Sequence, residues 1–476
     1  MKHLIRFLSL VLAALLLIAP LPASAEDAKA ADLSERCRSS IVLRRNYRFD
    51  ADGMFWIAWE DDVPATRLCI QWWVIPEHVT LLQLDGGGAL LSMETVASLP
   101  ETVTPLSADC RKVVVMAGNA GMTVNRCAVY GDGTLPDPFH EWAETPDKLD
   151  YLLISTHPDD DVLYLGSVIP VYGAEKGYVG TVAYVTCRSR RRMTEAENGA
   201  WAMGLRYRPL FLGFPDVDRA APQAEKDTFS YEELLLATVR MYRTYQPLVV
   251  FAQDENGEYG HWQHVLTSKA AVEAATLAAD PAYDSESAAQ YGTWQVQKVF
   301  LHLYEENRIM IDSHAPLSFF DGADAYEVAC KAYQKHESQQ EFWFSVKRDD
   351  AAYAFNRFGM AAGAVPAGED VFDNIDESLF SFYVPPTPEP TSEPTSEPTP
   401  VPTPESTAVP TPVPTSVPTA APSASPVPDT PSKPTEPMLP WIVLGGLFVC
   451  GIACALIFKT RKHAKKGQSQ DGGSAA

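Results

Sequence analysis

The chain has 476 residues and a formal net charge of −23, from 61 acidic and 38 basic residues. This balance argues against nucleic-acid binding, which requires a basic stripe to meet the phosphate backbone. The body of the chain, about residues 30–384, is long enough for two domains of ordinary size.

The N-terminus has the three parts of a secretory signal peptide. Lys2 and Arg6 supply positive charge, an apolar stretch runs from Phe7 to Ile18, and Ala23-Ser24-Ala25 supplies a small-residue cleavage site. An uncleaved membrane anchor is the alternative, but the shortness of the apolar stretch favours cleavage. We therefore expect residues 1–25 to be removed on export.

Residues 35–138 have the pattern of a small β-sandwich. Short β-branched or aromatic runs occupy residues 54–59, 68–74, 79–84 and 112–116. Turn residues such as Asp85-Gly86-Gly87-Gly88 separate these runs. Their rhythm and the closing strand at 125–131 resemble a galactose-binding or discoidin-like domain. Tryptophans in this part would fill the core or stack on sugars, and core filling is favoured.

The cysteines divide by region. Four lie in the predicted sandwich: Cys37, Cys69, Cys110 and Cys127. In an oxidising compartment these four are expected to form two disulfides, with three connectivities open. Cys187 and Cys330 are widely spaced and are expected to be free.

From residue 149 to 345, strand-like and helix-like stretches alternate. Strands are predicted at 149–156, 178–186, 210–214 and 248–251, with helices at 162–175, 194–203 and 231–245. This alternation predicts an α/β domain with a mostly parallel, Rossmann-like sheet and helices on both faces. Sites in such sheets form at the carboxyl ends of strands, where His157 follows the first strand. Residues 346–384 are predicted to be a C-terminal extension of the folded body.

The end of the chain predicts a stalk and a membrane anchor. Residues 385–437 are rich in Pro, Thr, Ser and Glu, so they cannot bury a core and favour an extended stalk on the order of 150 Å long. A ligand tract for proline-binding domains is the less favoured alternative. Residues 439–458 are apolar and long enough to span a bilayer, and the basic tail at 459–476 marks the cytoplasmic side. We expect a single-pass protein of the cell membrane with its body outside the cell.

Two clusters of side chains can carry chemistry. His157-Pro158-Asp159-Asp160-Asp161 places an imidazole and three carboxylates together, a partial ligand set for a divalent metal. His261 and His264 follow the fourth strand and offer the missing ligand. Alone, the first cluster is explained by a helix cap and the second by surface histidines. Their common position after strands of one sheet favours a metal site.

These clusters belong to an ordered series of motifs. Ser155 to Asp161 is similar to A-H-P-D-D-E, Arg192 to Glu195 to R-x-x-E, Leu212 to Asp216 to L-G-x-P-D, His261 to His264 to H-x-x-H, and His336 to Gln339 to H-x-S-Q. The series resembles the PIG-L/LmbE-like zinc deacetylases, which hydrolyse N-acetylglucosamine-containing substrates. The resemblance covers about residues 149–345.

The resemblance implies a Zn²⁺ site, or one for another divalent metal, with three ligands: His157, Asp160 and His264. It implies Asp159 as the general base that takes a proton from the attacking water and returns it to the departing amine. His261 would stabilise the developing oxyanion. Arg192 would bind polar groups of the sugar, with a solvated basic loop as the alternative.

Two positions depart from the family pattern. Asp161 stands where the family usually has Glu, so this carboxylate is one methylene shorter. Trp262-Gln263 stands where Pro-Asp is common, which changes the partners of the metal ligands. His336 is at least as consistent with a core or surface histidine as with a site residue. Ordinary roles are expected for four other histidines: His78, His140, His302 and His314.

The sequence thus predicts a zinc-dependent hydrolase that removes an N-acetyl group from an extracellular N-acetylglucosamine-type sugar, glycolipid or cell-wall glycan. One alternative is a carbohydrate-binding or adhesive surface protein with a catalytically degenerate deacetylase domain. Another is a metal-dependent hydrolase of a different amide. The presence of Asp159 favours an enzyme, because a binding module has no use for a general base.

Overall fold

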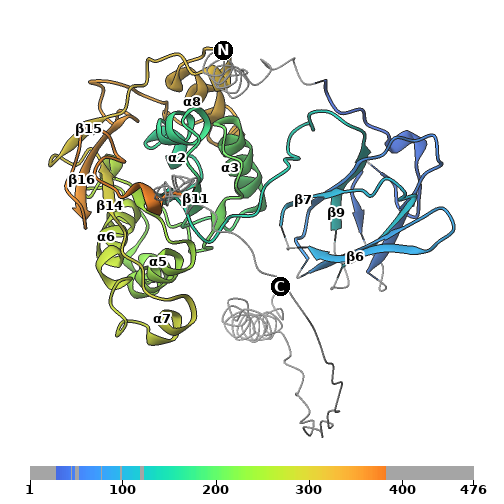
Figure 1. Cartoon of the computed structure of the whole chain (residues 1–476), viewed down its shortest axis with the longest axis horizontal. Helices are drawn as coiled ribbons and strands as arrows, with labels where there is room; N and C mark the ends of the chain where they lie inside the picture. The colour runs from blue at the N-terminus through green and yellow to red at the C-terminus, as the bar shows by residue number, and fades with distance from the viewer. Residues whose placement is uncertain are drawn as a thin grey trace, which may run out of the picture. The chain divides into compact units, whose positions relative to one another are not determined.

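The computed structural model describes residues 28–381, apart from 44, 49–52, 77, 97–98 and 118–122 (Figure 1). The chain divides into two compact units, residues 1–389 and 390–476, and all described residues belong to the first. The predicted signal peptide, stalk, membrane span and basic tail lie outside the described residues. Among the residues that are described, none of the helices has the length and apolar character needed to cross a membrane.

Two antiparallel sheets form the first part of the body. The five-stranded sheet has the order β1 (Arg38–Ser39), β3 (Met54–Ala58), β8 (Lys112–Ala117), β5 (Val79–Leu84) and β6 (Leu90–Val96). The four-stranded sheet has the order β2 (Tyr47–Arg48), β9 (Thr123–Tyr130), β4 (Arg67–Trp72) and β7 (Glu101–Pro105). A short helix, η1 (Ser34–Arg36), precedes them.

Alternate residues of these strands enter one shared core, as the period of two in a strand requires. In β3, Phe55 and Ile57 are buried while Met54 between the turn and the core is exposed. Apolar residues of both sheets, including Trp72 of β4, form a single buried cluster. The two sheets therefore cover one core, while the likeness to galactose-binding domains stays a prediction.

The expected disulfides are absent, because all six described cysteines are free. The strand register explains part of this difference. Cys127 of β9 lies opposite Ile70 of β4, and Cys69 lies opposite Ala128. Neighbouring positions of a strand point to opposite faces, so the Cys69 and Cys127 side chains lie on different sides of the sheet.

A mixed seven-stranded sheet carries the second part of the body. Its order is β12 (Leu210–Phe211), β11 (Gly180–Tyr184), β10 (Tyr151–Ser155), β13 (Val249–Ala252), β14 (Lys298–His302), β16 (Arg357–Gly363) and β15 (Arg308–Met310). The strands from β12 to β14 pair in parallel, whereas β16 and β15 are antiparallel. The α/β class is confirmed, and the sheet also recruits β16 from the segment expected to be an extension.

Helices pack on both faces of this sheet (Figure 1). Leu153 of β10 lies in one apolar cluster with residues of α2, α3 and α8, and Leu152 lies in another with residues of α5 and α6. The α-helices are α2 (Asp160–Leu163), α3 (Arg190–Ala202), α4 (Gln223–Lys226), α5 (Tyr231–Tyr245), α6 (Trp262–Leu277), α7 (Ser285–Tyr291) and α8 (Ala325–Tyr333). The shorter helices are η2 (Ile169–Glu175), η3 (Glu258–Gly260), η4 (Ser318–Phe320), η5 (Glu337–Gln339) and η6 (Glu377–Leu379).

Side-chain caps set where two of the longer helices begin. Asp324 and Glu327 form a reciprocal capping box at the start of α8. At the start of α6, the His261 ring accepts a hydrogen bond from the backbone N–H of Gln263. This cap ties one of the candidate histidines to a helix end that packs beside the sheet.

Candidate metal centre

The candidate residues meet at the carboxyl ends of two adjacent strands. β10 ends at Ser155, and the segment from His157 to Asp161 follows it directly. β13 is the parallel neighbour of β10, and η3 and the start of α6 follow β13. Loops after adjacent parallel strands lie at the same edge of a sheet, so the two predicted clusters are brought together.

Three of the predicted ligand atoms form a nearly equilateral triangle. His157 Nδ1 lies 2.9 Å from Asp160 Oδ2 and 3.1 Å from His264 Nε2, and the last two atoms are 3.2 Å apart. In a tetrahedral zinc site with bonds of about 2.0–2.1 Å, neighbouring ligand atoms are about 3.3 Å apart. The donor set of His157, Asp160 and His264 therefore fits a zinc ion.

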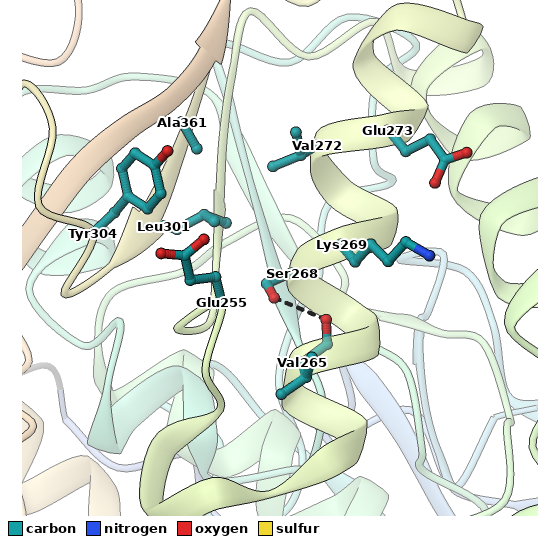
Figure 2. A pocket seen from close by; sticks show the side chains of 9 residues that line it. All are labelled: Glu255, Val265, Ser268, Lys269, Val272, Glu273, Leu301, Tyr304 and Ala361. Atoms are coloured by element: carbon teal, nitrogen blue, oxygen red, sulfur yellow. Dashed lines mark hydrogen bonds between the residues drawn. The ribbon is translucent and has the colours of Figure 1, made fainter.

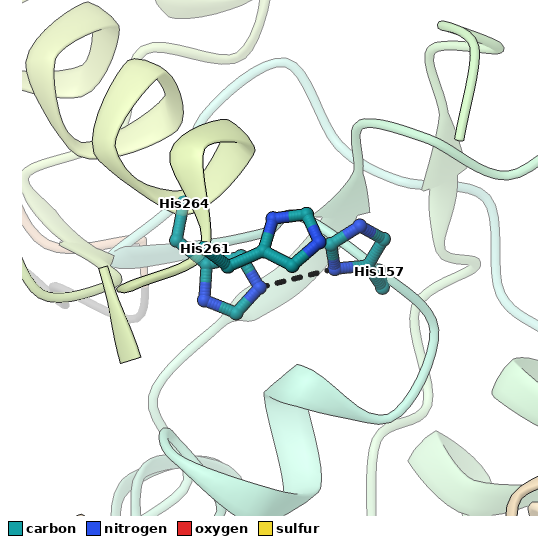
Figure 3. A group of neighbouring side chains, drawn as sticks. All are labelled: His157, His261 and His264. Carbon is teal, nitrogen blue, oxygen red and sulfur yellow. Dashed lines mark hydrogen bonds between the residues drawn. The ribbon is translucent and has the colours of Figure 1, made fainter. Parts of the chain in front are cut away.

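A third histidine stands beside this triangle. His157, His261 and His264 each offer a nitrogen within 4.8 Å of the others (Figure 3). The Nδ1 of His261 accepts the helix-capping hydrogen bond at 3.3 Å, which leaves Nε2 for other contacts. Burial lowers the pKa of His261 to about 3, so its ring is neutral and can donate a hydrogen bond from Nε2.

Asp159 lies next to the triangle in a strained turn. Its φ is 123°, a left-handed value rare for a residue with a side chain. Burial raises the pKa of Asp159 well above its ordinary value, and the nearby Arg192 only partly offsets this rise. A raised pKa makes the carboxylate a stronger proton acceptor.

Arg192 of α3 contacts the proposed base directly. Its Nη2 donates to Asp159 Oδ1 at 2.9 Å and also to the carbonyl oxygen of Pro158. These hydrogen bonds give the guanidinium a partner inside the site, in addition to the sugar contact predicted from the sequence. Arg192 is thus placed to fix the direction of the Asp159 carboxylate.

Asp161 points away from the triangle. Its Oδ2 accepts a hydrogen bond from the Tyr184 hydroxyl at 2.8 Å, and its Oδ1 accepts one from the backbone N–H of Asp159 at 3.2 Å. Burial raises the pKa of Asp161 to about 7. The shorter carboxylate that departs from the family motif therefore holds the turn that carries Asp159.

Three side chains that the sequence motifs do not include hold the ligands in place. Glu258 Oε2 lies 2.7 Å from His264 Nδ1, and its Oε1 lies 2.6 Å from Nδ1 of His302. Gln253 donates to Asp160 Oδ2 at 2.9 Å. Burial favours a high pKa for Glu258, but the two histidines outweigh it and hold the pKa at about 2. Carboxylates behind metal-binding histidines orient the ring and raise its basicity.

Gln263, the second departure from the motif, joins two segments of the site. Its side-chain oxygen accepts from the Val217 backbone N–H at 3.1 Å, and its nitrogen donates to the Pro215 carbonyl at 2.8 Å. These bonds place Asp216 so that its Oδ1 lies 3.6 Å from His157 Nε2. A glutamine at this position thus connects α6 to the loop after β12.

The late motif supports the site from behind. Ser338 donates its hydroxyl to Glu195 of α3 at 2.5 Å. His336 is fully buried, and its Nε2 lies close to Gly199 of α3, which favours the core reading of this histidine. The remaining described histidines lie elsewhere: His140 packs on Trp201, and His314 pairs with Asp349.

A separate cavity of about 390 Å³ lies beside α6 (Figure 2). Val265 and Val272 of α6, Leu301 of β14 and Ala361 of β16 contribute apolar lining. None of the predicted site residues lines this cavity. It is therefore distinct from the candidate metal centre.

Comparison with known proteins agrees with this geometry. The sequence model of a family described as "PIG-L: GlcNAc-PI de-N-acetylase" matches residues 152–275. These residues form a PIG-L domain. The matched stretch contains the metal triangle, Asp159, Arg192 and His261.

Similar proteins of this PIG-L domain are deacetylases. The chain is 29% identical to a 1D-myo-inositol 2-acetamido-2-deoxy-alpha-D-glucopyranoside deacetylase of Catenulispora acidiphila, over 31% of this chain and 54% of the relative. It is also 29% identical to the protein of that name in Geodermatophilus obscurus, over 31% of this chain and 59% of the relative. The chain thus spans little more than half the length of these relatives.

Among solved structures, the chain is similar to the N,N'-diacetylchitobiose deacetylase of Pyrococcus horikoshii. The identity is 21% and the TM-score 0.32, over 41% of this chain and 73% of that one.

Proposed function

We propose that the PIG-L domain is a zinc-dependent N-deacetylase that acts on N-acetylglucosamine-type sugars. The observation that carries this proposal is the triangle of His157, Asp160 and His264, with edges of 2.9–3.2 Å, beside the buried carboxylate of Asp159. The names of the similar proteins support the choice of an N-acetylated sugar.

The chemistry divides among the residues of the site. When bound at the triangle, zinc lowers the pKa of a water molecule toward about 7 and polarises the amide carbonyl. Asp159 accepts the proton from the attacking water, and Arg192 keeps its carboxylate pointed at that water. Asp159 then delivers the same proton to the departing amine, so that acetate and a free amino sugar result.

The neutral His261 ring completes the site. Its Nε2–H donates to the oxygen that gains negative charge as the carbonyl carbon becomes tetrahedral. His261 is held for this task at the start of α6, where its Nδ1 caps the helix.

The proposed location follows from the sequence at the two ends of the chain. The signal-peptide pattern at 1–25 and the apolar run at 439–458 favour a body outside the cell, anchored by a single span. A glycan, glycolipid or cell-wall sugar is the substrate that such a body meets. An adhesive or carbohydrate-binding protein with a degenerate domain is the rival, and the intact Asp159–Arg192 pair favours the enzyme.

The test compares the full chain with Asp159→Ala and His157→Ala. Zinc content and acetate release from a panel of N-acetylated sugars are measured for each protein. We expect Asp159→Ala to retain zinc and lose activity by about 10²–10⁴-fold, since it removes a general base but no ligand. His157→Ala is expected to lose zinc. Zinc-loaded wild type that releases no acetate from any sugar would disprove the deacetylase, and zinc loss in Asp159→Ala would show that the base is misassigned.

A further inference from the structure

Two large aromatic side chains are exposed near the candidate centre. The fractional exposure of Phe342 is 55% and that of Trp343 is 67%, whereas the neighbouring Val346 is buried. Large apolar side chains that gather at the surface beside a site are candidates for ligand contact. The two rings therefore need an explanation beyond packing.

A series of ring contacts joins these residues to the metal ligands. The Tyr259 ring centre lies 5.7 Å from that of His261 and 5.6 Å from that of His264. On its other side, the Tyr259 ring centre lies 6.1 Å from that of Trp343. Trp343 is thus one aromatic ring away from the histidines of the candidate centre.

The segment that carries the two rings is held at several points. Phe344 packs beneath it, with its ring centre 4.5 Å from that of Trp343 and 5.4 Å from that of Tyr259. On the N-terminal side, the Gln340 side chain donates to the carbonyl oxygens of Tyr333 at 2.8 Å and His336 at 3.2 Å. Trp343 is therefore presented to solvent on a supported segment.

We propose that Trp343, together with Phe342, stacks on the sugar ring adjacent to the acetylated one. The substrate is then a glycan of two or more rings, and this inference rests on the deacetylase function proposed above. A pyranose ring offers an apolar C–H face bordered by hydroxyl groups. An exposed aromatic face bordered by polar groups matches that pattern.

The surroundings of the two rings favour a sugar over a lipid surface. Glu341 and Ser345 flank them in the chain and are exposed. Arg219 donates to the carbonyl oxygen of Tyr259 at 3.0 Å, which brings a further polar group to this part of the site. An anionic lipid surface calls for a cluster of basic residues, and the acidic Glu341 opposes it.

The test uses N-acetylglucosamine and its β-1,4-linked dimer, trimer and tetramer as probes. The rate of acetate release gives kcat/KM for the full chain and for Trp343→Ala, Trp343→Phe and Phe342→Ala. We expect Trp343→Ala to lower kcat/KM about five- to tenfold on the oligomers and less than about twofold on the monomer. Trp343→Phe keeps an aromatic face and is expected to retain most of the activity on the oligomers.

The matched control is Phe319→Ala. Phe319 is 46% exposed in the same part of the body, but its ring packs on Arg206 and Phe320. It is expected to leave kcat/KM unchanged on every probe. Thermal unfolding of each variant checks that the fold is retained.

The outcomes separate this inference from the function on which it rests. Wild type that releases acetate from no probe overturns both. Acetate release from the oligomers and the monomer that Trp343→Ala lowers equally, or does not lower, overturns only the stacking platform. Binding to anionic lipid vesicles that Trp343→Ala abolishes, with unchanged kinetics on the oligomers, would assign the patch to a membrane and overturn the sugar contact.

Discussion

The carboxylate of Glu258 is predicted to control how tightly the site holds zinc. Glu258 and both of its histidine partners are fully buried, at distances of 2.7 Å from His264 and 2.6 Å from His302. His264 is a proposed ligand through Nε2, so Glu258 acts on the opposite nitrogen of a metal-binding ring. Its negative charge makes that ring a better donor to a cation.

Glu258→Gln removes the charge while keeping the shape. The amide oxygen can still accept from His264 Nδ1, and the amide nitrogen can donate to His302 Nδ1. His302 allows this exchange because its Nε2 faces the carbonyl oxygen of Ala354 at 2.9 Å, which requires the proton on Nε2. No buried polar group loses its partner, so we expect the fold to survive.

Zinc affinity is expected to fall by about 10–100-fold in Glu258→Gln, or about 1.4–2.8 kcal/mol. Competition with a fluorescent chelator at fixed pH measures the change. Glu197→Gln is the matched control, because Glu197 is a buried glutamate of α3 that pairs with Arg208 at 3.3 Å. Zinc affinity in Glu258→Gln within twofold of wild type, or an equal fall in Glu197→Gln, would refute the role of the charge.

Three further variants test the surroundings of the site. Burial raises the pKa of Glu197 well above its ordinary value, so the folded state holds this proton more tightly and stability falls as pH rises from about 4.5 toward the raised pKa; Glu197→Gln should flatten that fall in urea unfolding at several pH values. In Gly199→Ala the new Cβ lies 2.6 Å from His336 Nε2, so we expect a loss of about 1–3 kcal/mol in thermal or urea unfolding despite the better helix propensity of Ala, and His336→Ala in the same chain should relieve it. Tyr184→Phe leaves the buried Asp161 without its hydroxyl donor and should cost about 1–3 kcal/mol with zinc content unchanged; zinc loss would instead place Asp161 among the ligands.

The part of the site that the sequence predicts depends on adjacent strands. His157 follows β10 and His264 follows β13, and these two strands pair in parallel, so motifs 107 positions apart meet. The α/β class follows from the alternation of strands and helices. The antiparallel β16 does not, because it returns to the sheet after that alternation has ended.

The partners of the ligands could not be predicted, because they depend on sheet order and helix orientation. His302 ends β14, and only the pairing of β14 with β13 brings it within 2.6 Å of Glu258. Its position at the end of a buried apolar strand was a usable signal, since sites in such sheets form at strand ends. Arg192 lies in a basic run whose appearance suits a solvated loop, and the direction of α3 turns it toward Asp159.

The same dependence explains why the short Asp161 is compatible with an intact site. Its position in the motif suggests a residue that must reach the metal, in which case a missing methylene would be harmful. In the structure its carboxylate instead reaches the Tyr184 hydroxyl on the neighbouring strand β11 and the backbone N–H of Asp159. A longer side chain at this fully buried position would have to displace Tyr184, at a cost of about 1–3 kcal/mol from overpacking. The aspartate and the tyrosine are therefore matched to each other, and the pair sets the strained turn from which Asp159 faces the metal centre.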